Sequence, residues 1–282
     1  MRDRLIGLAI VFRDAGLHFS LEAAAFFAQA IAFSALFAII PLSLLVVAMF
    51  GYIFGTADGL AYAVAAMDAF VPQLHDLVTQ SLASAVRYRG ISGLVGLLGL
   101  MWSAKNVFGA MTYALDRALG VPSRHFVLEM AIALILVPVI GLVILIATAI
   151  PIVISFVVHF AGLEYLKIAP QIASYGGSLV LVFVLTTLVY TYLPNRPAHI
   201  RFGIPGAVVT AIGYSIIQVA FAVYTTHTNV LEIYGTLSAV FAGMLWIYLN
   251  CALFLYGAHF SACWEQQFDR HAVPHVAAQV AS

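Results

Sequence analysis

The sequence has 282 residues, of which 63% are hydrophobic and 9% are charged. Soluble domains carry about 25% charged residues, so this composition excludes an ordinary soluble globular protein and predicts an integral membrane protein. Twelve Lys and Arg residues balance twelve Asp and Glu residues, and this neutrality gives no support for a nucleic-acid partner.

Residues 1–22 are predicted to form an amphipathic N-terminal segment. Leu5, Leu8, Ala9 and Phe12 share one helical face, while the charged residues of this stretch lie elsewhere around the helix. This pattern is typical of a helix that lies along the inner surface of a membrane.

Residues 23–263 are predicted to form a single membrane domain. A window of about 20 apolar residues is long enough to cross the hydrocarbon core of a bilayer. Six stretches meet this criterion, at about 25–54, 91–113, 127–159, 172–193, 203–226 and 233–263. The expected fold class is therefore an all-α integral membrane protein, a bundle of six transmembrane helices.

The segments between and after the spans have patterns of their own. Residues 57–88 show apolar residues at alternating spacings of four and three, and Pro72 divides them into a short external helical hairpin. This hairpin either caps the bundle or pairs with another subunit, so a homo-oligomer is one of the expected assemblies. Residues 264–282 are polar and Ala-rich and are expected to form a cytoplasmic tail.

The distribution of Lys and Arg predicts the orientation, because cytoplasmic loops of membrane proteins carry an excess of positive charge. With the N-terminus inside, nine positive residues fall on the cytoplasmic side and three on the outside. The expected location is the bacterial inner membrane, with both termini cytoplasmic. The nine are Arg2, Arg4, Arg13, Lys105, Arg117, Arg124, Arg196, Arg201 and Arg270, and the three are Arg87, Arg89 and Lys167.

Polar groups within the spans are candidates for a transport pathway, since such groups are costly in hydrocarbon. Helical rise along alternating spans places several of them in the inner leaflet. They predict a polar cavity open to the cytoplasm, with Lys105 supplying positive charge. The candidate cavity residues are Gln29, Lys105, Asn106, Thr187, Tyr190, Tyr214, Asn250 and His259.

A structural interpretation of the same residues stays open. Lys105 can extend its ammonium group to the interface and pack its stem on apolar surface. Asn106 and Asn250 suit hydrogen bonds between helices, and a buried structural role suits His259. Asp116 and Arg117 are expected in an interfacial charge cluster.

Small residues at helical spacing predict where helices approach each other closely. Gly235, Ala239 and Gly243 recur every four residues on the last span, and Gly206 begins a similar pattern on the fifth. Pro41 inside the first span predicts a kink there. These five residues are the candidate helix-packing positions.

Three groups of short motifs occur in order along the chain. They are Ala32-Phe33-Ser34 with Pro41; Trp102-Ser103-Ala104 with Ala114 to Val121; and Leu193 to Arg196 with Pro205-Gly206-Ala207, Tyr234 to Leu237, Trp246-Ile247-Tyr248 and Leu255 to Ala258. Together they resemble the YihY / BrkB family, whose members were once described as ribonuclease BN. The resemblance covers about residues 20 to 265 and implies a six-helix inner-membrane fold without a settled activity. Ser34 stands where the family usually has Tyr, and His259 where it usually has Glu.

The sequence offers no pattern of a catalytic site. Its nine histidines are scattered without metal-ligand spacing, and no basic stripe is available for RNA. Neither an enzymatic activity nor a cofactor or metal is therefore expected, and ribonuclease activity is disfavoured. The favoured function is transport of an unidentified small solute or lipid, with membrane lipids as further partners; the alternative is a non-transporting envelope scaffold or interaction protein.

Overall fold

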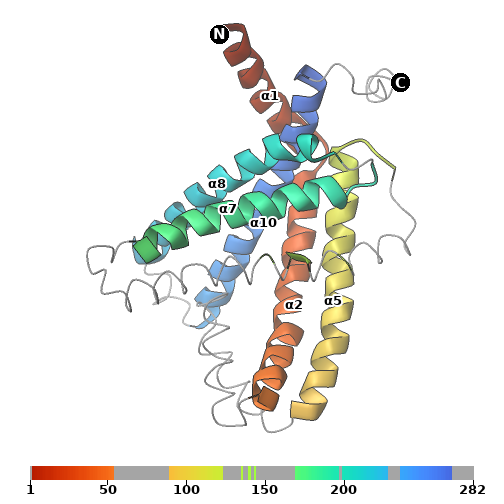
Figure 1. Cartoon of the computed structure of the whole chain (residues 1–282), viewed down its shortest axis with the longest axis vertical. Helices are drawn as coiled ribbons and strands as arrows, with labels where there is room; N and C mark the ends of the chain where they lie inside the picture. The colour runs from red at the N-terminus through yellow and green to blue at the C-terminus, as the bar shows by residue number, and fades with distance from the viewer. Residues whose placement is uncertain are drawn as a thin grey trace. The chain divides into compact units, whose positions relative to one another are not determined.

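The structure is a computed structural model of the whole chain (Figure 1). It describes residues 2–53, 89–122, 169–196, 199–227 and 236–268, together with positions 135, 139, 140 and 143. Every regular element in this part of the chain is an α-helix. The helices are α1 (Arg2–Leu21), α2 (Ala24–Ile53), α5 (Arg89–Ala118), α7 (Ala169–Tyr192), α8 (Ile200–His227) and α10 (Thr236–Phe268).

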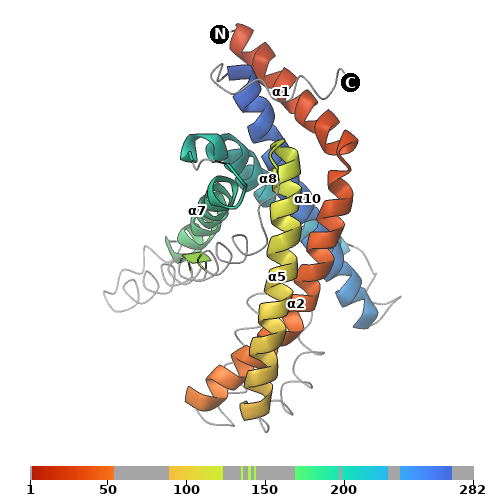
Figure 2. The ribbon, with the colours of Figure 1, turned by 90° about the vertical axis from the view of Figure 1, so that its right-hand side faces the viewer.

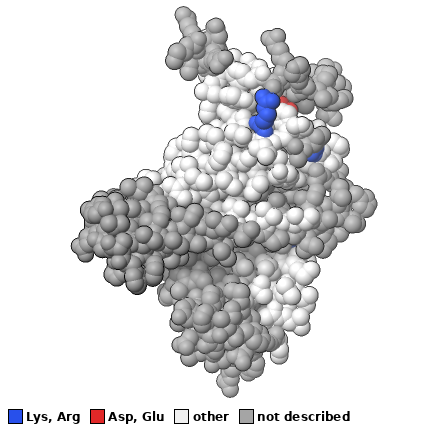
Figure 3. Space-filling view, in the orientation of Figure 1, with Lys and Arg blue, Asp and Glu red and all other residues white. Residues whose placement is uncertain are grey.

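Four of the described helices are long and apolar enough to cross a membrane. The qualifying stretches are Ala24–Leu42, Gly93–Ala118, Ile200–Tyr224 and Val240–Phe268, and α7 adds a shorter one at Gly176–Tyr192. Few charged side chains show among the described residues on the face in Figure 3. The predicted class, an all-α membrane protein, is confirmed.

Five predicted spans correspond to described helices, namely α2, α5, α7, α8 and α10. The predicted third span, 127–159, lies outside the described residues except for isolated helical positions, and the external hairpin at 57–88 lies wholly outside them. Helix α10 continues to Phe268, so the first residues of the predicted tail are helical.

The chain divides into two compact units. The first combines Met1–Ala25, Met111–Gln218 and Ala252–Ser282, and the second combines Phe26–Ala110 and Val219–Cys251. Helices α2, α5, α8 and α10 each contribute residues to both units.

In the first unit, α1 packs against the C-terminal part of α10 (Figure 2). Val11 and Ala15 are buried there with Phe260 and Cys263. This contact overlaps the predicted apolar face, because Leu8 packs against the same cluster and the Phe12 ring lies 4.7 Å from the Phe260 ring, whereas Ala9 is exposed. The buried face extends to the Val11 side because α10 covers it, and a sequence pattern does not reveal which neighbour a helix will have.

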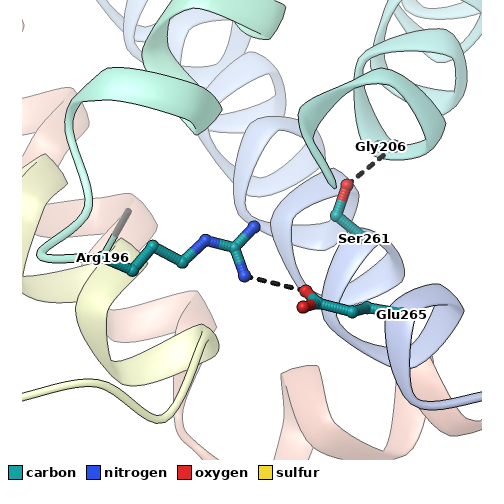
Figure 4. Close-up of polar contacts among 4 residues, drawn as sticks. All are labelled: Arg196, Gly206, Ser261 and Glu265. Carbon is teal, nitrogen blue, oxygen red and sulfur yellow. Dashed lines mark hydrogen bonds and ion pairs between the residues drawn. The ribbon is translucent and has the colours of Figure 1, made fainter. Parts of the chain in front are cut away.

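Helices α7 and α8 lie side by side in the same unit (Figures 1 and 2), and α8 crosses α10. A methyl group on Gly206 would overlap the carbonyl oxygen of Gly257, so the two backbones touch without intervening side chains. The Gly206 N–H also donates to Ser261 Oγ at 2.9 Å (Figure 4). Gly206, predicted from its spacing, thus lies at this crossing.

In the second unit, α2 approaches α5 closely where Pro41 faces Gly99. A methyl group on Gly99 would lie 2.9 Å from Pro41 Cβ, which is tighter than ordinary packing. At Gly243, a methyl group would meet no heavy atom of the described residues within 4 Å. Gly235 and the Ala239 side chain lie outside the described residues, so close packing on that face of α10 stays a prediction.

Candidate functional site

A cavity of about 610 Å³ lies in the first unit, where three helix ends come together. Its volume falls within the range of small-molecule sites. The walls come from the end of α1, the end of α5 with the loop after it, and the C-terminal part of α10. The lining residues are His18, Glu22, Asp116, Arg117, Ala118, Leu119, Gly120, Val121, Pro122, His259, Ala262, Cys263 and Gln266.

The α5 wall is shaped by the way this helix ends. The Gly120 N–H donates to the Arg117 carbonyl at 3.1 Å, and the Val121 N–H donates to the Asp116 carbonyl at 2.8 Å. Together these bonds form a Schellman motif, which needs a left-handed residue at Gly120, and φ there is 63°. The motif reverses the chain, so that consecutive residues from Asp116 to Pro122 all line the cavity.

Asp116 attaches this wall to the loop between α7 and α8. The carboxylate is almost fully buried, and its Oδ1 accepts the backbone N–H of Asn195 at 2.7 Å. Asn195 returns a second bond, from Nδ2 to the Pro122 carbonyl at 2.6 Å. A hydrogen bond to a carboxylate is stronger than a bond between neutral groups. The two hydrogen bonds of Asn195 therefore hold the end of α5 against the loop between α7 and α8.

The same loop is also attached to α10. Arg196 Nη1 lies 2.8 Å from Glu265 Oε2, and both side chains are largely buried (Figure 4). The Arg196 guanidinium also lies over the Phe202 ring, 4.8 Å from its centroid. The loop therefore holds two of the three cavity walls in a defined arrangement.

Glu22 is positioned by the tight turn between α1 and α2. Its N–H donates to the His18 carbonyl at 2.9 Å, and the next residue, Ala23, adopts a left-handed φ of 55°. Glu22 Oε1 lies 3.4 Å from His18 Nδ1. The other oxygen, Oε2, is shielded from solvent and has no hydrogen-bond partner among the described residues.

The electrostatics of Glu22 follow from this placement. Burial raises the pKa of the Glu22 carboxyl above its usual value, because desolvation disfavours the charged form. His18 and, to a smaller extent, Arg117 lower this pKa and offset part of the effect. The result is an under-solvated carboxyl that gains from a bound proton or another hydrogen-bond donor.

On the α10 side, His259 is buried in the cavity wall. Its ring packs in a T-shaped arrangement against the Phe19 ring, with 6.1 Å between the two centroids. Within the described ranges, no three His, Cys, Asp or Glu side chains lie close enough to hold a metal ion.

His259 is the predicted cavity residue that lines this cavity. Three others belong to the same unit but not to its lining. Thr187 donates to the Phe183 carbonyl in its own helix, and Tyr214 is half-buried. Tyr190 lies 2.9 Å from Thr210 Oγ1 and donates to the Phe254 carbonyl, so it ties α7 to α8 and α10.

The remaining four predicted cavity residues belong to the second unit. Gln29 and Lys105 are exposed, and Asn106 is half-buried. Asn250 donates from Nδ2 to the Trp246 carbonyl, one turn earlier in its own helix. A role for these residues in a transport pathway stays a prediction.

Sequence reasoning did not assign His18, Glu22, Asp116 or Arg117 to a cavity. A signal was present for the last two, because Leu119-Gly120-Val121-Pro122 is the pattern of a helix end and both precede it. For Glu22 the signal was a lone carboxylate between two apolar helical stretches.

Comparison with known proteins identifies a family and several similar membrane proteins. A family model described as virulence factor BrkB matches residues 17–280. UPF0761 membrane proteins of Alteromonas mediterranea and Mannheimia succiniciproducens are 26% and 27% identical; the matches cover 75% and 83% of this chain and 72% and 82% of the relatives. No solved structure gives a significant match.

One relative bears a different kind of name. A protein of Bacillus subtilis named ribonuclease-like, YfkH, is 27% identical over 174 residues, or 59% of this chain. The match spans less than two thirds of that relative's own length, at 63%.

Proposed function

Since the chain belongs to the family described as virulence factor BrkB, we propose that it is an inner-membrane transporter of a small polar solute or of a lipid. The cavity between α1, α5 and α10 binds the polar group of that compound. The observation that carries this proposal is the gathering of six titratable or charged side chains around one cavity in a chain with 9% charged residues. Such groups in membrane proteins mark substrate and ion pathways.

The distribution of positive charge supports a cytoplasmic opening. Nine of the twelve Lys and Arg residues fall on one side when the spans alternate, and this side faces the cytoplasm by the positive-inside rule. The end of α5 and the C-terminal part of α10 lie on that side, as do both termini. The cavity therefore takes its ligand from the cytoplasm or from the inner leaflet.

The proposal does not include RNA cleavage. The name ribonuclease-like belongs to the Bacillus relative, and the scattered histidines and the neutral charge of this sequence do not suit a nuclease. An envelope scaffold without transport is the competing function, and it predicts that filling the cavity changes nothing but packing.

Thermal unfolding of the purified protein in detergent tests the proposal. A ligand that binds the folded state at about 100 times its Kd adds about 2.7 kcal/mol to the free energy of unfolding. Phosphate, acetate, ammonium, glycine and two lipids, phosphatidylethanolamine and phosphatidylglycerol, are compared as probes. We expect at least one of them to raise the melting temperature.

A cavity-filling variant locates the effect. Ala262 lines the cavity, so Ala262→Trp occupies its volume without removing a charge. Ala9→Trp is the matched control, because Ala9 is exposed on α1. Ligand stabilisation lost in the first variant and kept in the second supports the proposal, whereas equal stabilisation of both variants contradicts it.

A further inference from the structure

We propose that Glu22 is a shared site for a proton and for the cationic amine group of the transported compound, so that binding of one excludes the other. This inference rests on the proposed function and names its substrate class and its coupling. The chemistry is that of a primary ammonium group, carried either by a free amine or by the ethanolamine head of a lipid.

The unsatisfied oxygen of Glu22 is the first argument. A carboxylate accepts hydrogen bonds at both oxygens, and Oε1 faces His18 Nδ1 at 3.4 Å. Oε2 is shielded from solvent with no partner among the described residues. A proton on the carboxyl removes the charge that this poorly solvated oxygen carries, and an N–H of a ligand supplies the donor that it lacks.

The charge around the cavity is the second argument. The lining contains one Arg and two carboxylates, Asp116 and Glu22, which leaves one net negative charge when both histidines are neutral. Asp116 already accepts the Asn195 N–H. Glu22 is the carboxylate placed to bind a cation, because 27% of its side-chain surface is exposed while Asp116 is almost fully buried. An anionic ligand would meet two carboxylates in the same cavity.

The surroundings of Glu22 make proton binding competitive. The titratable and charged groups of the three walls are His18 from α1, Asp116 and Arg117 from α5, and His259 and Cys263 from α10. Burial is the largest influence on the pKa of Glu22 and raises it from 4.5. Because its pKa is raised, Glu22 still binds a proton at a pH where an exposed carboxylate is already ionised. A proton therefore competes with an ammonium ion for Glu22 at higher pH than it would at an exposed carboxylate.

Three compounds of nearly equal size test the charge requirement. Ethanolamine is a cation, glycolate an anion and ethylene glycol neutral, and each is titrated against the full-length protein while the melting temperature is followed. We expect ethanolamine to stabilise the protein and the other two to have no effect. Its apparent Kd should weaken about tenfold for each pH unit below the pKa of Glu22, because one bound proton excludes one cation.

Three substitutions distinguish the contribution of Glu22 to ethanolamine binding from those of nearby charged side chains. Glu22→Gln keeps the size of the side chain and should abolish both the ethanolamine effect and its pH dependence. Asp14→Asn removes a nearby carboxylate on α1, which pairs with Arg13 and does not line the cavity, and this variant should keep both the ethanolamine effect and its pH dependence. Arg117→Gln removes the competing cation, so ethanolamine should bind more tightly.

Two outcomes would overturn the inference. Stabilisation by glycolate but not by ethanolamine, lost in Ala262→Trp, would overturn it and leave the proposed transporter standing. Stabilisation by ethanolamine that Glu22→Gln retains at every pH would overturn it as well. Phosphatidylethanolamine and phosphatidylglycerol form the lipid arm: an effect of the first lipid alone, lost in Glu22→Gln, assigns the ammonium group to a lipid, and an effect of free ethanolamine assigns it to a solute.

Discussion

The Asp116 carboxylate accepts the backbone N–H of Asn195 at 2.7 Å and so joins two segments that lie 79 residues apart in the sequence. One segment is the end of α5 and the other is the loop between α7 and α8. Both contain motifs that resemble the BrkB family, and here they form and brace one side of a cavity.

Removing this hydrogen bond should destabilise the protein. Asp116→Ala leaves the Asn195 N–H without its acceptor, and an unsatisfied buried group costs about 1–3 kcal/mol. Asp116→Asn keeps an acceptor oxygen and should lose less. Thermal unfolding in detergent measures both variants, and equal melting temperatures for them would contradict the assigned role of the Asp116 side chain.

The crossing of α8 and α10 should not tolerate a side chain at Gly257. A methyl group there would overlap Thr210 Oγ1 and approach the Tyr190 hydroxyl at 2.6 Å. Gly257→Ala should therefore lower the free energy of unfolding by about 1–3 kcal/mol through overpacking. Gly176→Ala is the control, because no described atom lies within 4 Å of its added methyl group; similar losses in the two variants would refute the close crossing.

The turn that positions Glu22 carries backbone strain at Ala23. A left-handed residue with a Cβ costs about 1–2 kcal/mol, and φ of Ala23 is 55°. Ala23→Gly should therefore raise the melting temperature. Ala30→Gly, within α2, should lower the free energy of unfolding by about 1 kcal/mol, and a decrease in both variants would argue against strain at the turn.

Burial of Glu22 predicts a pH dependence of stability. Below its usual pKa of 4.5 the carboxyl is protonated in both the folded and the unfolded state and has no effect. As the pH rises from 4.5 through the higher pKa of the folded state, the half-buried carboxyl ionises less readily in the folded than in the unfolded state, and the free energy of unfolding falls. Melting curves of Glu22→Gln should lack this fall, and parallel pH profiles for the variant and the wild type would contradict it.

The positions of the helices could be predicted because they depend on local composition. Apolar stretches of span length fall on α2, α5, α8 and α10. The spacing of Gly206 likewise indicated a close approach, although its partner Gly257 could not be named from sequence, because a small residue shows that a neighbour fits and not which neighbour it is.

The cavity could not be predicted because it is made by tertiary contacts. Helical rise orders residues by depth along a span but does not show which of them face the same space. Lys105 was expected in a cavity on this basis; it is exposed and belongs to the second unit, and its role in a cavity stays a prediction. Glu22 lies in the turn next to Ala23 and Arg117 in the Schellman motif that ends α5, and only the tertiary structure shows that both line one cavity.

Uptake of radiolabelled ethanolamine into proteoliposomes tests the central claim most directly, because it measures transport through the cavity and not binding alone. The wild type should take up ethanolamine faster than Ala262→Trp protein and faster than vesicles without protein, while Ala9→Trp should match the wild type. Equal uptake by wild-type protein, by Ala262→Trp and by empty vesicles would contradict the account.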